Sequence, residues 1–250
     1  MRKYLMLTMA IAALIAVSVA GIATGANKPV TVEAGNLVFT FNGGFSPTKL
    51  PKKTFAPISL TASGKISTKD GTHPPALKET IVETDKNGAI NVKGLAKCTS
   101  GQLQSRDTKA AEKVCGKSII GTGTTTVEVQ FPEQKPIDVT SKLLVINGGF
   151  SGGTTTLYIH AYFSAPVTGA IVTTLKIKKV KNGRYGLKTI ATIPKIAGGS
   201  GSVKTFNLTI NKKGVLTAKC PDGKLQAKAT AIFSDGTKAS AGIIRTCTGK

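Results

Sequence analysis

The stretch AIVTTLKIKKVKNGRYGLKTI, residues 170–190, decides the fold class of this 250-residue chain. Two runs rich in apolar and β-branched residues flank the dipeptide Asn182-Gly183. Asn-Gly tolerates the positive φ angles of a tight turn, so the stretch predicts two antiparallel strands joined by a hairpin.

Similar runs recur along the chain, separated by further Asn-Gly and Asp-Gly dipeptides. We expect strands at residues 37–41, 58–62, 80–84, 125–131, 143–146, 155–163, 170–180, 187–193, 203–210, 225–233 and 241–245. About a dozen short strands at this spacing predict an all-β fold, and we expect an antiparallel β-sandwich.

One segment favours a helix instead. Residues 106–115 are rich in helix-forming side chains, and Asp107 or Thr108 can cap the start of the segment. Gly116 suits the position after its end. The sequence therefore predicts a single short helix beside the sheets.

The N-terminus has the pattern of a secretory signal peptide. A basic start at residues 1–4 precedes an apolar run from Leu5 to Ile22, and small residues follow. We expect cleavage after Ala26, with Ala20 and Ala23 as alternatives, and a single membrane anchor as the competing interpretation. The protein is therefore expected to be secreted, and a location at the cell wall is compatible with this.

Residues 27–250 are expected to form one large β-sandwich domain. The pentapeptide Asn-Gly-Gly-Phe-Ser occurs at 42–46 and again at 147–151, which would fit a duplication into two halves split near 132–138. The residues after the two copies diverge at once, so we favour a shared hairpin turn.

The four cysteines indicate disulfides. No Cys-x-x-Cys pair is present, which argues against a zinc or redox site. An even number of cysteines in an exported chain indicates disulfides, although the sequence alone allows three pairings. We expect Cys98–Cys115 and Cys220–Cys247, because each pair brackets one compact local segment.

Residues for acid–base or metal chemistry are scarce, since the chain has only two histidines and twelve carboxylates. His73 precedes two prolines in an extended or turn segment, where an exposed loop residue is the simpler interpretation. His160 shares one face of a predicted strand with Tyr158 and Tyr162, which we interpret as an ordinary semi-exposed face.

No carboxylate lies between Asp138 and Asp222, so His160 has no acidic residue nearby in sequence to orient it. We therefore expect no catalytic residue, no metal site and no cofactor. The alternative is an extracellular hydrolase that uses His160 or His73 with a carboxylate brought close by folding.

Positive charge dominates the chain, whose net charge is +22. The densest candidate binding patch comprises Lys176, Lys178, Lys179, Lys181, Arg184 and Lys188. Such a field attracts polyanions in a salt-dependent way. Nucleic acid is not the expected partner, because arginines are few and aromatic residues do not alternate with the lysines.

The partners that we expect are an anionic cell-wall polymer, an acidic polysaccharide or anionic lipid. A competing interpretation is that the lysines only keep an exported β protein soluble and protect its edge strands from pairing.

Three segments carry a resemblance to known proteins. Gly71-Thr-His-Pro-Pro-Ala-Leu77, Lys219-Cys-Pro-Asp-Gly-Lys-Leu225 and Phe233-Ser-Asp-Gly-Thr237 resemble uncharacterised secreted proteins of soil actinobacteria. This resemblance implies export and a β-rich fold, and it implies no functional residue.

These observations lead to one functional hypothesis and two alternatives. The hypothesis is a non-catalytic secreted or envelope-associated protein that contacts anionic polymers through a lysine-rich face. The alternatives are the hydrolase above and a structural or adhesive β module that self-associates through edge strands; the oligomeric state is left open.

Overall fold

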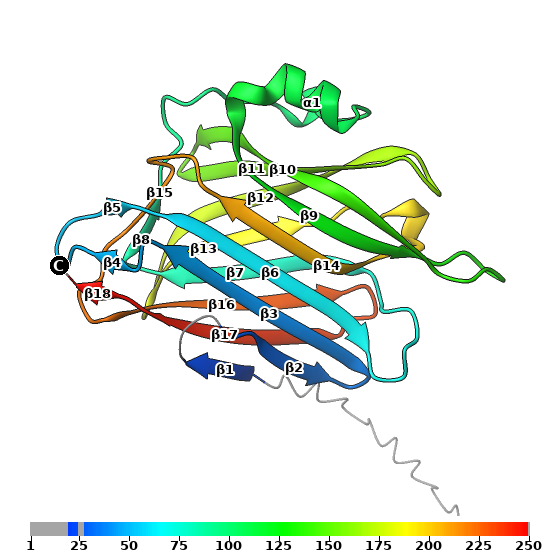
Figure 1. Cartoon of the computed structure of the whole chain (residues 1–250), viewed down its shortest axis with the longest axis horizontal. Coiled ribbons are helices and arrows are strands. Elements are labelled where there is room, and N and C mark those ends of the chain that lie inside the picture. The colour runs from blue at the N-terminus through cyan, green and yellow to red at the C-terminus, as the bar shows by residue number, and fades with distance from the viewer. Residues whose placement is uncertain (1–19, 25–27, 250) are drawn as a thin grey trace, which may run out of the picture.

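The computed structural model describes residues 20–24 and 28–249, which form a large curved sheet with a short helix on its outside (Figure 1). The predicted signal segment, residues 1–26, lies outside the described residues except for β1 (Ala20–Thr24). β1 pairs in parallel with one edge of the large sheet.

The other strands follow in chain order. They are β2 (Val30–Ala34), β3 (Leu37–Ser46), β4 (Lys49–Leu50), β5 (Ala56–Pro57), β6 (Ser59–Thr68), β7 (Leu77–Asp85), β8 (Gly88–Ile90), β9 (Ile119–Val129), β10 (Ile137–Ser151), β11 (Thr154–Phe163), β12 (Gly169–Asn182), β13 (Tyr185–Thr192), β14 (Gly201–Ile210), β15 (Leu216–Ala218), β16 (Lys224–Phe233), β17 (Lys238–Thr246) and β18 (Thr248–Gly249). The α-helix, α1, spans Thr108–Cys115, and three short 3-10 turns span Ser100–Gln102, Gly116–Ser118 and Ala197–Gly199.

The large sheet has the strand order β1-β17-β16-β7-β13-β12-β11-β10-β9-β14-β6-β3-β2. Apart from β1, all neighbouring strands in it are antiparallel. β17 also contacts β2 and β3, so the two ends of the sheet approach each other. The predicted all-β antiparallel fold is confirmed.

The predicted sandwich needs correction, because the strands form one continuous sheet that is nearly barrel-shaped and not clearly a sandwich. The alternation of apolar and polar residues does not distinguish the two, because a curled sheet and two stacked sheets bury the same strand faces. The approach of the two ends of the sheet also shields its edge strands from pairing with other chains. The two strands that flank residues 132–138, β9 and β10, pair with each other in this sheet.

The helix matches its prediction. The Asp107 carboxylate accepts a hydrogen bond from the Ala110 N–H at 2.8 Å, so Asp107 is the N-cap of α1, and Gly116 follows the helix. Ala111 is buried against the outer face of β10. The predicted Cys98–Cys115 disulfide ties the last residue of α1 to the segment before it.

The two Asn-Gly-Gly-Phe-Ser segments are not hairpin turns, which corrects that prediction. Residues 42–46 continue β3, and residues 147–151 end β10. In β10 the Asn147 side chain accepts a hydrogen bond from the Gly149 N–H, and the strand bulges there with Gly149 at a φ of 101°. An Asn-Gly pair can therefore bend a strand without reversing it. Asn182-Gly183 does form the predicted turn, with Gly183 at a φ of 56°.

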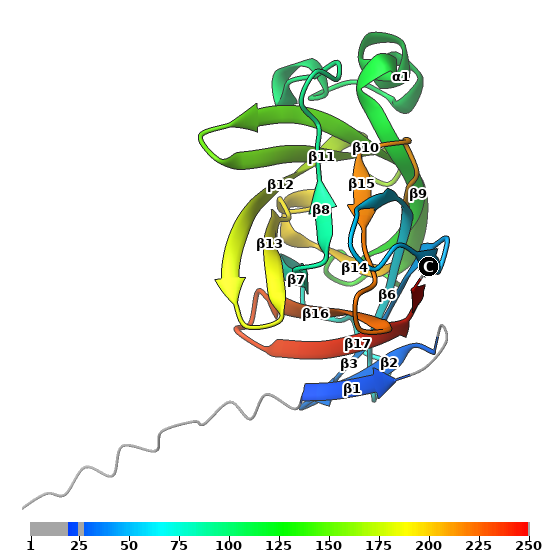
Figure 2. The same cartoon turned by 90° about the vertical axis from the view of Figure 1, so that its left-hand side faces the viewer.

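A small three-stranded sheet, in the order β5-β15-β8, lies across one end of the large sheet (Figure 2). The predicted Cys220–Cys247 disulfide lies beside it, and Cys220 follows β15 by two residues. Among residues 20–24 and 28–249, no helix has the length and hydrophobicity needed to cross a membrane.

Candidate functional site

The register of the large sheet brings many strand ends together at one rim. Thr154 pairs with Lys178, and beyond the β12–β13 turn Tyr185 pairs with Asp85, the last residue of β7. On the other side Ile210, at the end of β14, pairs with Leu60 near the start of β6. These segments lie at the end covered by the small sheet, on the left in Figure 1.

We call the lysines of this end the basic rim. They are Lys49, Lys52, Lys53, Lys86, Lys93, Lys97, Lys178, Lys179, Lys181, Lys212, Lys213, Lys219 and Lys224. Within the described chain, none of them forms an ion pair with a carboxylate. Two exposed aromatic rings lie among them: the Lys93 ammonium lies 4.8 Å from the centre of the Phe150 ring, and the Lys219 ammonium 5.3 Å from that of Phe55.

The lysine patch predicted from the sequence divides into groups. Lys178, Lys179 and Lys181 belong to the basic rim, close to the β12–β13 turn. Lys176, Lys178 and Lys188 point to the outside of the sheet, because their neighbours Ile177 and Leu187 face its interior. The outer-face pair Lys178–Lys188 continues into Glu83 on β7.

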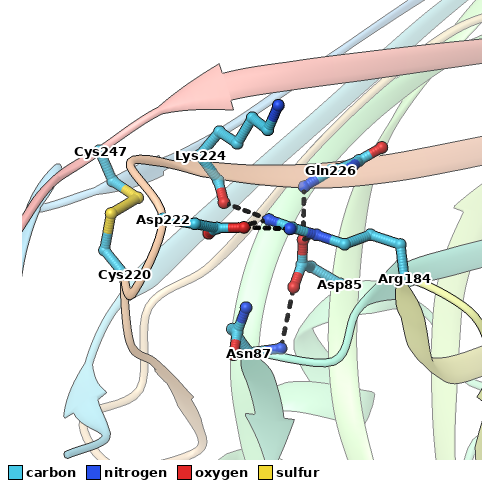
Figure 3. Close-up of a disulfide and its surroundings, with 8 residues drawn as sticks. All are labelled: Asp85, Asn87, Arg184, Cys220, Asp222, Lys224, Gln226 and Cys247. Carbon is cyan, nitrogen blue, oxygen red and sulfur yellow. Dashed lines mark hydrogen bonds and ion pairs between the residues drawn. A yellow bond between two sulfur atoms is a disulfide. The ribbon is translucent and has the colours of Figure 1, made fainter. Parts of the chain in front are cut away.

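Arg184 differs from the rest of the predicted patch, because its guanidinium forms ion pairs with two carboxylates, Asp85 and Asp222 (Figure 3). Its Nε donates to the buried Asp85 carboxylate at 2.7 Å, and its two Nη atoms donate to Asp222. Nη2 also donates to the Lys224 carbonyl at 2.7 Å. Hydrogen bonds to Asp222 and then Asp85 raise the pKa of Arg184, despite its partial burial. Arg184 therefore links β7, β13 and the start of β16, and its charge is neutralised locally.

His73 is not the exposed loop residue that the sequence predicted, because its side chain is only 20% exposed and is held by residues far away in sequence. Its Nδ1 lies 2.8 Å from Glu128 Oε1, and its Nε2 lies 3.0 Å from Ser202 Oγ. The Lys204 ammonium bridges Glu128 and Asp138. Although burial raises the pKa of Glu128, hydrogen bonds from Lys204 and His73 outweigh it and lower that pKa. These hydrogen bonds and ion pairs hold the β6–β7 connection, which contains His73, against the outer face of β9 and β14.

The order Ser202–His73–Glu128 matches that of a nucleophilic triad. Ser202 is only 1% exposed, however, and its hydroxyl donates a hydrogen bond of 2.6 Å to the Pro74 carbonyl. A buried hydroxyl that is already committed to a carbonyl is poorly placed to attack a substrate. The sequence did not point to Glu128 or Ser202, because they lie 55 and 129 positions from His73.

His160 is fully buried, so the predicted semi-exposed face is wrong at this residue. The segment that leads into α1 covers it, and His160 Nε2 lies 2.9 Å from the Arg106 carbonyl oxygen. Nδ1 has no hydrogen-bond partner among the residues described. Burial lowers the pKa of His160, which favours the neutral ring.

No protein family, curated protein or solved structure matches this chain. Function must therefore be inferred from the site itself. The two disulfides are compatible with an extracellular protein.

Proposed function

We propose that this protein is a non-catalytic secreted or envelope-associated protein whose basic rim contacts anionic polymers. The observation that carries the proposal is the gathering of lysines from separate connections at one end of the sheet, none of which forms an ion pair with a carboxylate among residues 28–249. Export is the expectation from the basic and apolar N-terminal pattern.

At the opposite rim of the large sheet some lysines are paired with carboxylates, so the two ends of the molecule differ in charge. There Lys69 pairs with Glu33 at 2.6 Å, and Lys204 pairs with both Glu128 and Asp138. Positive charge at the two ends is therefore unequally neutralised, and a polyanion would be steered towards the basic rim. Phe55 and Phe150 would add apolar contact there.

The proposal predicts that position, and not total charge, controls polymer binding. We compare Lys53→Glu/Lys181→Glu/Lys213→Glu at the basic rim with Lys135→Glu/Lys195→Glu/Lys238→Glu, a control of equal charge change on exposed lysines near the other rim. With immobilised alginate as the probe, we expect the rim variant to bind at least about tenfold more weakly at ~0.1 M salt, and the control to bind nearly as the parent protein does.

Equal losses in the two variants would show that only net charge matters, and the proposal would fail. It would also fail if the parent protein showed no salt-dependent retention on alginate or on cell-wall material. Retention on phosphatidylglycerol vesicles alone would identify lipid in place of a polymer as the partner.

A hydrolase remains the second candidate, because His73 lies within hydrogen-bond distance of both a hydroxyl and a carboxylate. We expect Ser202 to stay unmodified when the folded protein is treated with a fluorophosphonate probe, because its side chain is buried. Mass spectrometry of the tryptic peptide that contains Ser202 measures this, with labelling after denaturation as the background. Labelling of Ser202 in the folded protein that Ser202→Ala abolishes would support the hydrolase and contradict the non-catalytic proposal.

A further inference from the structure

The inner face of the curled large sheet, together with the small sheet, lines an apolar cavity of about 370 Å³, which we call the lumen. Its wall combines inward-facing residues of most strands of the large sheet with residues of the small sheet, such as Ile90 on β8 and Leu216 on β15. Protein interiors are normally packed so closely that voids larger than a water molecule are few. A cavity of this size inside a curled sheet therefore needs an explanation.

The sequence produces the cavity by placing small residues at inward positions. Ala231 on β16 pairs with Thr80 on β7, and Thr80 pairs on its other side with Ala191 on β13. All three side chains line the lumen. Along β16, the inward residues between Leu225 and Phe233 are alanines throughout. Larger aliphatic residues at these positions would fill the space, as they do in small barrels with packed interiors.

The two charged side chains at the lumen wall, Asp85 and Arg245, form hydrogen bonds with other groups of the protein. The Asp85 carboxylate accepts hydrogen bonds from the Arg184 Nε and from the Gln226 N–H. The Arg245 guanidinium donates to the Gly43 carbonyl at 2.6 Å and to the Lys28 carbonyl at 3.0 Å. Most of the remaining wall is aliphatic, aromatic or threonine, so the chemistry that fits it is that of an uncharged and largely apolar molecule.

From these observations we propose that the lumen is a binding site for one uncharged, apolar small molecule. Apolar cavities of only about 150 Å³ stay dry and accept benzene-sized molecules. Small-molecule sites typically measure about 300–1000 Å³ and are mostly apolar. The volume and the lining of the lumen match both criteria.

The test uses N-phenyl-1-naphthylamine, an uncharged aromatic probe, with the purified protein. We expect saturable binding of one probe per chain, followed by fluorescence, and a rise in the melting temperature at saturation. Ala191→Phe adds a ring at a position of β13 that lines the lumen, and it is expected to weaken probe binding at least about tenfold.

Thr192→Phe is the matched control, because it adds the same ring to the neighbouring residue, which is exposed on the outer face of β13. It is expected to bind the probe as the parent does. If near-ultraviolet circular dichroism shows that Ala191→Phe does not fold, Ala231→Leu replaces it, because leucine fills less of the lumen. Ala231→Leu is also expected to weaken probe binding.

Absence of saturable binding to the parent protein would overturn the inference. So would equal losses in Ala191→Phe and Thr192→Phe, because the probe would then lie on the outer face. The inference goes beyond the basic rim and does not need it. Failure of alginate binding with intact probe binding would remove only the proposed function, and the reverse result would remove only the lumen site.

Discussion

Arg184→Met is expected to lower the free energy of unfolding by about 3 kcal/mol, because removing one partner of a buried ion pair leaves the other charge uncompensated. The Asp85 carboxylate is 3% exposed and would lose its 2.7 Å hydrogen bond from Arg184 Nε. Asp222 and the Lys224 carbonyl would lose their donor as well. Urea unfolding at pH 7 measures the change, and thermal unfolding should show a loss of about 6–12 °C.

Lys181→Met is the matched control, since it removes a neighbouring positive charge from the same β12–β13 hairpin at an exposed position. We expect it to change stability by no more than about 0.5 kcal/mol. Asp85→Asn combined with Arg184→Met should recover part of the loss, because no buried charge is then left. If Arg184→Met lowered the free energy of unfolding no more than Lys181→Met does, the ion pairs of Arg184 would contribute nothing to stability, and the prediction would be wrong.

Replacing both members of the second disulfide, as Cys220→Ser/Cys247→Ser, is expected to cost about 3.5 kcal/mol in the chain-entropy account of cross-links. The two cysteines are 27 positions apart, and the loop between them contains the whole of β16 and β17. Both are buried in a cluster with Leu50 and Ala218, so the variant also places two hydroxyls in an apolar environment. Equilibrium unfolding in urea measures the difference.

The first disulfide provides the comparison. Cys98 and Cys115 are 17 positions apart, so Cys98→Ser/Cys115→Ser should cost slightly less, about 3 kcal/mol. It should release α1 from the outer face of β10 while the large sheet stays folded, which hydrogen exchange can follow. A Cys220→Ser/Cys247→Ser protein within about 1 kcal/mol of the parent would contradict the chain-entropy argument for this loop.

Local features were the most predictable from the sequence. The strand at residues 155–163, the turn at Asn182-Gly183 and the helix with its Asp107 cap each depend on a few neighbouring residues. Both disulfides were also predicted, because each closes a short segment. The prediction that both Asn-Gly-Gly-Phe-Ser segments form hairpin turns was wrong, because the outcome is not local. Whether an Asn-Gly pair reverses a strand or only makes a bulge in it depends on the partner strand.

The candidate sites were less predictable, because they combine residues that are distant in the chain. The lysines of residues 176–188 were found as a run, but only the fold separates Arg184 from them, through Asp85 and Asp222. Glu128 and Ser202 reach His73 only because the β6–β7 connection packs against the end of β9 and the start of β14. Strand alternation identified the two faces of the His160 strand, but it could not show that the segment before α1 buries that histidine.

By itself, the sequence predicted an antiparallel all-β fold with a short helix near residues 106–115, and it showed the excess of lysine, since period, turn residues and charge are local or additive properties. Only the tertiary structure decided how the strands close, and therefore whether they stack as two layers or curl around a lumen. The physical reason is that alanines and threonines on one face of a strand indicate that this face is buried, but they do not indicate which residues lie opposite it. The space between opposite walls depends on the curvature of the whole sheet, a property that no single strand carries.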